Sequence, residues 1–120
     1  MARKLGQGYS LALRTGEGTH MTLVYFNHLR RGYEQEMVKA AADEYFQERG
    51  LHHLDLKFGE IHEKRSIRVH GEVEQVIKDL QQKFSSSYDI DLTQQAHIDL
   101  RGVNPEKLST VVSTSSNWNH

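Results

Sequence analysis

The chain has 120 residues, a formal net charge of −1 and no cysteine, so it fits one domain with a single modest core and excludes disulfides and thiolate metal sites. The balanced charge argues against a dedicated binder of duplex nucleic acid but permits a small nucleotide, whose phosphates need only local positive charge. No apolar run is long enough to span a membrane and the first ten residues lack a signal-peptide core, so we expect a cytoplasmic protein without membrane contact.

Alternating and helical spacing of apolar residues predicts the main elements. In chain order we expect strands over 9–15 and 19–26, a helix over 33–49, strands over 51–62 and 66–71, a helix over 72–84, and strands over 97–101 and 109–114. Gly50 is placed to end the first helix, and Asn104 followed by Pro105 predicts a short helical turn. Residues 85–95 read as a polar loop.

This order predicts one α+β domain with its core at about residues 9–112 and a polar tail over 113–120. We expect two helices to cover one face of a mainly antiparallel sheet and to leave the other face open.

Three of the expected strands begin with a histidine and place polar side chains on one face. Residues two apart along a strand point the same way, so the polar members would line the open face while their apolar neighbours pack beneath the helices. The three polar sets are His20 and Thr22; His53, Asp55 and Lys57; and His97, Asp99 and Arg101. Each strand taken alone reads as an amphipathic strand with a solvated side.

Two of these segments, HMTLVYF from His20 and AHIDLRG around His97, resemble the paired His-x-Thr/Ser motifs of the 2H phosphoesterase superfamily. That superfamily includes RNA ligase-like proteins, cyclic phosphodiesterases and phage nucleases that open cyclic oligonucleotides. The resemblance extends over about residues 9–112 and includes a middle hairpin with Phe58-Gly59. It implies two similar halves whose motifs face each other across a cleft. The sequence departs from the family pattern at Asp99, where the family has Ser or Thr.

The resemblance implies a catalytic role for both histidines without a metal or other cofactor. Cleaving a phosphodiester needs a base for the attacking oxygen and an acid for the departing one, and histidine titrates near neutrality. His20 and His97 would divide these roles, in either order. Thr22 would donate a hydrogen bond to a phosphate oxygen, and Asp99 would orient a histidine or contact a ribose hydroxyl.

Further side chains are candidates for substrate binding. A cation near the phosphate could come from Arg14, Lys57 or Arg101, and an aromatic surface for a base could come from Tyr9 or Trp118. We expect Trp118 to lie in the tail and to fold over the cleft. Tyr25 is expected to face the core, opposite His20, and His53 to be a rim or solvated residue.

The leading hypothesis is a metal-independent phosphodiesterase. Its substrate would be a small nucleotide with a 2′,3′-cyclic phosphate, a 2′–5′ linkage or a cyclic oligonucleotide. One alternative is a nucleotide-binding module of the same fold in which Asp99 has ended turnover. Another is a metalloprotein that uses His20, His97 and a carboxylate such as Asp55 or Asp99.

Overall fold

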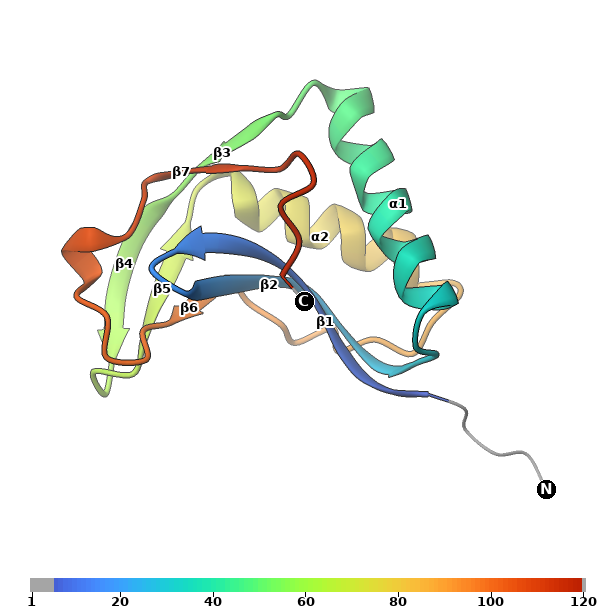
Figure 1. Cartoon of the computed structure of the whole chain (residues 1–120), viewed down its shortest axis with the longest axis horizontal. Helices are drawn as coiled ribbons and strands as arrows, with labels where there is room; N and C mark the ends of the chain where they lie inside the picture. Colours follow the sequence, from blue (N-terminus) through green and yellow to red (C-terminus); the bar gives the residue numbers. More distant parts are fainter. Residues whose placement is uncertain (1–5, 120) are drawn as a thin grey trace.

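The computed structural model describes residues 6–119 and has an α+β fold (Figure 1). Strands β1 (Gln7–Gly16) and β2 (Thr19–Leu29) form a long hairpin that precedes helix α1 (Tyr33–Arg49). The later elements are β3 (His53–Asp55), β4 (Lys57–His62), β5 (Ser66–His70), α2 (Glu72–Ser85), β6 (His97–Asp99), the short 3₁₀ helix η1 (Pro105–Lys107) and β7 (Val111–Ser113). The predicted combination of two helices with a mainly antiparallel sheet is confirmed.

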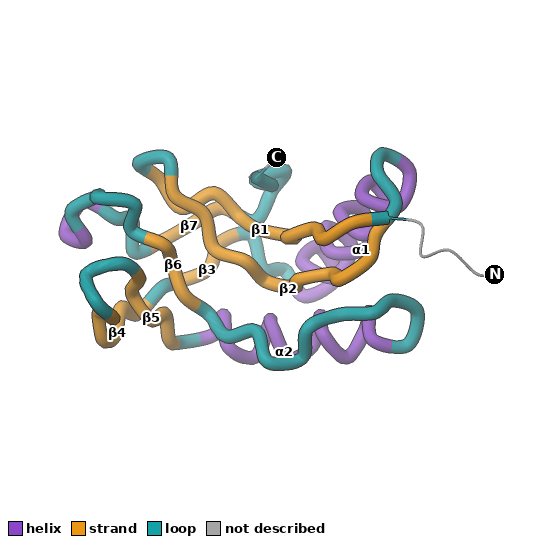
Figure 2. The backbone as a smooth tube through the Cα atoms, turned by 90° about the horizontal axis from the view of Figure 1, so that it is seen from below, coloured by secondary structure: helices purple, strands orange, loops and turns teal. Residues whose placement is uncertain are grey.

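The main sheet has five antiparallel strands in the order β1-β2-β6-β5-β4, and β3 pairs with β7 in a separate two-stranded sheet. Strand β6 is late in the chain, yet it occupies the middle of the sheet between β2 and β5 (Figure 2). The strand that begins with His97 therefore lies directly beside the strand that contains His20.

One hydrophobic core joins the inner face of the five-stranded sheet to the helices and the small sheet. Met21 of β2 and Ile98 of β6 are fully buried on that face. They belong to the same cluster as Val38 of α1, Leu80 of α2 and Leu54 of β3. Burying side chains of this size stabilises the fold by about 1.5–3 kcal/mol each. This core determines which side chains of β2 and β6 point inward, and so which side chains lie on the outer face.

The buried residues of both helices recur at helical spacing, although Met37 of α1 is exposed. The buried stripe of α2 includes Val73, Val76 and Leu80. Helix α1 ends at Gly50, whose φ of 65° lies in the left-handed region that glycine adopts without strain. Within residues 6–119, neither helix has the length and apolar character needed to cross a bilayer.

The strand predicted over 51–62 is instead two strands in different sheets. Leu54 lies in β3, which pairs with β7, whereas Phe58 lies in β4, which pairs with β5. Between them, the Leu56 amide donates to the carbonyl of Thr110 at 2.7 Å. The chain changes sheets at Leu56 while its apolar alternation continues, so the pattern alone predicted one strand.

The expected polar tail is structured as far as Asn119. The Asn119 amide donates to the carbonyl of Ala12 at 2.7 Å, and the Asn117 carbonyl accepts from the Arg14 amide at 3.0 Å. This segment therefore pairs with the outer edge of β1 and covers backbone groups that an edge strand would leave exposed.

Strand β2 contains a β-bulge at Leu23. Consecutive residues of β1 pair with Val24 and Thr22, which leaves Leu23 as the extra residue. Beyond it the two faces of β2 exchange, so Phe26 is buried and Tyr25 is 36% exposed. The prediction that Tyr25 faces the core is therefore wrong.

Candidate active site

The two histidine motifs meet on neighbouring strands. Met21 of β2 and Ile98 of β6 are register partners in an antiparallel pair. In that register His20 lies opposite Asp99, and Thr22 lies opposite His97. All four side chains project from the outer face because their neighbours Met21 and Ile98 are buried in the core. The structure thus brings the predicted catalytic residues into one group on the open face.

Exposure within this group is uneven. His20 and Thr22 are half-buried, whereas His97 and Asp99 are exposed. The β6 side chains of this group are therefore more accessible to solvent than the β2 side chains.

Burial lowers the pKa of His20 below its ordinary value. The guanidinium of Arg101 lowers this pKa further, the carboxylate of Asp99 raises it, and a charge on His97 lowers it. Three charged groups near β6 thus act on one imidazole across the strand pair. The balance keeps His20 neutral at neutral pH, so its ring can accept a proton.

The ring of His97 is held from the loop before β6. Its Nδ1 lies 2.9 Å from the carbonyl oxygen of Gln95. A carbonyl only accepts hydrogen bonds, so Nδ1 holds the hydrogen of the neutral ring and Nε2 carries the lone pair.

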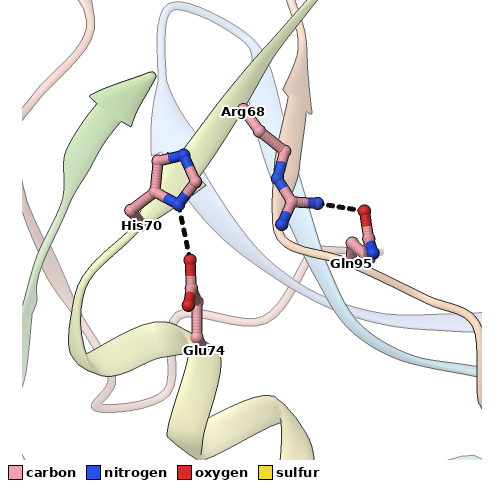
Figure 3. A network of polar contacts seen from close by, with 4 residues as sticks. All are labelled: Arg68, His70, Glu74 and Gln95. Atoms are coloured by element: carbon pink, nitrogen blue, oxygen red, sulfur yellow. Dashed lines mark hydrogen bonds and ion pairs between the residues drawn. The ribbon is translucent and has the colours of Figure 1, made fainter. Parts of the chain in front are cut away.

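Gln95 also holds a cation beside His97. Arg68 of β5 is the register partner of His97, and its Nη1 donates to the side-chain oxygen of Gln95 (Figure 3). Two positions along the same strand, the imidazole of His70 pairs with Glu74 of α2 at 2.6 Å. Sequence reasoning did not identify Arg68 or Gln95. The Gln95 contact with His97 uses a backbone atom, which leaves no signal in residue type.

A serine on β1 orients the hydroxyl of Thr22. The Ser10 and Thr22 side-chain oxygens lie 2.8 Å apart. If Ser10 donates in this pair, the Thr22 hydrogen is free to point at a ligand oxygen. Sequence reasoning missed Ser10, although its position in the alternating strand over 9–15 was a usable signal.

Asp99 is partly neutralised by its neighbour. One carboxylate oxygen accepts from the Arg101 amide at 3.3 Å, and the other lies 3.7 Å from the Arg101 guanidinium. Both side chains are more than half exposed, so this pair adds little stability. Its effect is local, because it reduces the repulsion between Asp99 and an anion at the histidines.

A pocket of about 540 Å³ adjoins this group on the side away from β2. Its walls come from the turn between β4 and β5 and from β6 with the turn that follows: Lys64, Arg65, Ser66, His97, Asp99 and Arg101. Ser66 is the register partner of Asp99 on β5. Lys64, Arg65 and Ser66 were not predicted, although two adjacent cations in the turn were visible in the sequence.

Some predicted residues lie elsewhere. Trp118 is only 7% exposed and its indole nitrogen donates to Asp43 of α1 at 2.9 Å. It therefore supports the core and does not fold over the site, which corrects the prediction. Tyr9 packs against Phe26, with ring centroids 6.4 Å apart, and so faces the core side as well.

Two predicted cations are also displaced from the group. Arg14 is the register partner of His20, but its side chain lines a separate pocket beside Glu36 and Lys39 of α1. Lys57 pairs with His70 at the end of β5 far from Ser66. Of the three proposed cations, Arg101 is the one that adjoins the histidines.

His53 and Asp55 lie in the small sheet, paired with Ser113 and Val111, and are exposed. Across residues 6–119, no group of three or more histidine, cysteine, aspartate or glutamate side chains is arranged to hold a metal ion.

Tyr25 is an aromatic residue whose placement was mispredicted. Its hydroxyl lies over Gly8 of β1, so close that a side-chain carbon added at Gly8 would fall 2.0 Å from it. Gly8 thus leaves the space on β1 that the Tyr25 hydroxyl occupies. The sequence signal was the three consecutive apolar residues at 23–25, which permit either face.

Comparison with known proteins adds no family assignment, because no family model, curated protein or solved structure matches the chain.

Proposed function

We propose that the chain is a metal-independent phosphodiesterase that cleaves a small nucleotide by acid–base catalysis with His20 and His97. The observation that supports this is the register of β2 and β6, in which each histidine lies opposite the second residue of the other motif. This reciprocal arrangement agrees with two similar halves that meet at a cleft, as the resemblance to 2H phosphoesterases implies.

The charges around the two rings favour one division of labour. His20 is the base, since burial and Arg101 keep it neutral, and it removes a proton from the attacking oxygen. That oxygen forms a bond to phosphorus while the bond to the leaving oxygen breaks. His97 is the acid and protonates the leaving oxygen through Nε2, since the Gln95 carbonyl holds Nδ1 at 2.9 Å.

Thr22 stabilises the negative charge that the non-bridging phosphate oxygens carry in the transition state. Its hydroxyl, oriented by Ser10 at 2.8 Å, donates to a non-bridging phosphate oxygen. Arg68, the register partner of His97, and Arg101 supply positive charge on the opposite side of the group.

The test is turnover in excess chelator. The wild-type chain is incubated with 2′,3′-cyclic mononucleotides, 2′–5′-linked dinucleotides and cyclic di- and trinucleotides. His20→Ala and His97→Ala should each lower kcat/KM about 10²–10⁴-fold. The matched control is His53→Ala. His53-Leu54-Asp55 has the same pattern as His97-Ile98-Asp99 but lies in the small sheet.

Retention of full turnover in both motif variants, or loss of turnover in chelator, would refute the mechanism. Asp99 favours one second candidate, a nucleotide-binding module, because it places a carboxylate opposite His20. Binding without turnover in the wild type, with turnover gained in Asp99→Thr, would favour that module.

A further inference from the structure

The pocket beside His97 is strongly cationic in a chain whose net charge is −1. Lys64, Arg65 and Arg101 line it together with a single carboxylate, Asp99. Asp99 is engaged by Arg101 at 3.7 Å. Among the residues that the structure describes, neither Lys64 nor Arg65 has a carboxylate within ion-pair distance. The pocket thus offers unneutralised positive charge to an anion.

The turn that presents Lys64 is conformationally unfavourable. Glu63 and Lys64 have φ values of 50° and 59°, and the Arg65 amide closes the turn onto the His62 carbonyl at 2.8 Å. Both central residues of a type I′ hairpin turn have positive φ, which is why Asn-Gly is preferred there. A charged pair occupies these positions instead, against the local preference.

The two walls of the pocket are joined by the backbone. The Leu100 amide donates to the carbonyl of Arg65 at 2.7 Å. Arg101 follows directly, with a φ of 49°. The cations of both walls are therefore held on connected, restrained turns, and their separation is set by the fold.

The pocket is one nucleotide step from the proposed cleavage point. His97 and Asp99 belong both to the pocket and to the catalytic group. Strand β5 lies two strand spacings, roughly 10 Å, from β2. A nucleotide chain whose phosphodiester lies between His20 and His97 would extend its neighbouring phosphate across β6 toward Lys64 and Arg65.

We propose that this pocket is a subsite for a second phosphate, so that the substrate is an oligonucleotide with at least two phosphates and not a 2′,3′-cyclic mononucleotide. This inference rests on the proposed function for the position of the cleaved phosphate. The cationic pocket itself is independent of catalysis, so binding and turnover can be measured separately.

The binding arm uses the deoxydinucleotide of adenine with its one internal phosphate and the same molecule with an added 5′- or 3′-terminal phosphate. Calorimetry at low salt should show that one of the two phosphorylated forms binds wild type about 10-fold more tightly. The variant Lys64→Gly/Arg65→Ala should reduce that preference to less than about twofold. Glycine suits the positive φ of position 64, so the variant should fold at least as stably as wild type. Lys83→Ala, an exposed lysine on α2, is the control and should keep the preference.

Equal binding of all three ligands to wild type would overturn the subsite. So would a preference that survives in the double variant or is lost equally in Lys83→Ala, since general charge would then explain it. The turnover arm uses the corresponding 2′–5′- and 3′–5′-linked ribodinucleotides. Turnover that depends on His20 and His97 but ignores the extra phosphate would refute the subsite and leave the phosphodiesterase standing. Preferential binding of the phosphorylated form without turnover would support the subsite and refute the phosphodiesterase.

Discussion

Replacing Trp118 by alanine tests whether the C-terminal segment is part of the fold. The indole is 7% exposed, packs on Phe46 with ring centroids 6.2 Å apart, and donates to Asp43 at 2.9 Å. A tryptophan buries about 150–250 Å², worth about 4–6 kcal/mol at about 25 cal/mol per Å². The extended-chain reference makes that an upper figure, so we expect Trp118→Ala to lower the free energy of unfolding by about 4 kcal/mol.

The assay is urea unfolding followed by circular dichroism, with Trp118→Phe as the matched variant. Phenylalanine keeps one ring against Phe46 but loses the hydrogen bond to Asp43, about 1 kcal/mol, and part of the buried ring area, so it should cost less than alanine. In thermal unfolding the alanine variant should melt about 12–20 °C below wild type. An alanine variant with the wild-type midpoint would show that Trp118 is not packed against α1 and that the segment does not cover the edge of β1.

Three other predictions concern the helix contact and the site. Burial, together with the hydrogen bond that Tyr45 donates to Asp79 at 2.7 Å, raises the pKa of Tyr45 to about 12. Tyr45→Phe should therefore lower the free energy of unfolding by about 1 kcal/mol in urea at neutral pH. An unchanged midpoint would contradict that contact. The same contact lowers the pKa of Asp79 in the folded state. The stability that the contact adds is therefore fully present above the pKa of the unfolded carboxyl, about 3.9. It is lost as the pH falls through the lower pKa of the folded state. The pKa of His20, measured by NMR titration, should lie below about 6.5. It should rise in Arg101→Ala, because the Arg101 guanidinium lowers it in wild type. A lower His20 pKa in that variant would refute the assigned charge contact. Because folding lowers this pKa, protonation of His20 opposes folding, and its effect should appear only as the pH falls below about 6.5. Thr22→Val should lower kcat about 10–100-fold, while Thr22→Ser should stay within a few-fold of wild type. An equal loss of kcat in both variants would show that Thr22 acts through packing and not through its hydroxyl.

Local sequence patterns predicted the elements better than their assembly. Helix α1 was predicted at its observed bounds, and α2 within one residue, because apolar spacing and Gly50 act locally. The division at Leu56 was not visible, since apolar residues alternate through it without interruption. The docking of Trp118 depends on Leu13 and α1, which are distant in sequence, so composition alone suggested a polar tail.

For the candidate site, strand alternation correctly placed His20 with Thr22 and His97 with Asp99. No periodicity could pair these two strands, and their proximity was expected only from the resemblance to paired motifs. The bulge at Leu23 places Tyr25 on the outer face. Strand alternation does not predict this bulge, because the extra residue, Leu23, is apolar like its neighbours.

NMR of the imidazole resonances can show whether His20 and His97 bind the same phosphate. A nucleotide 3′-monophosphate, a product analogue that cannot be turned over as a diester, is titrated into the wild-type chain. We expect the ring signals of His20 and His97 to shift together with one saturation curve, while those of His53 in the small sheet stay in place. Shifts confined to one of the two rings, or spread equally to His53, would contradict it.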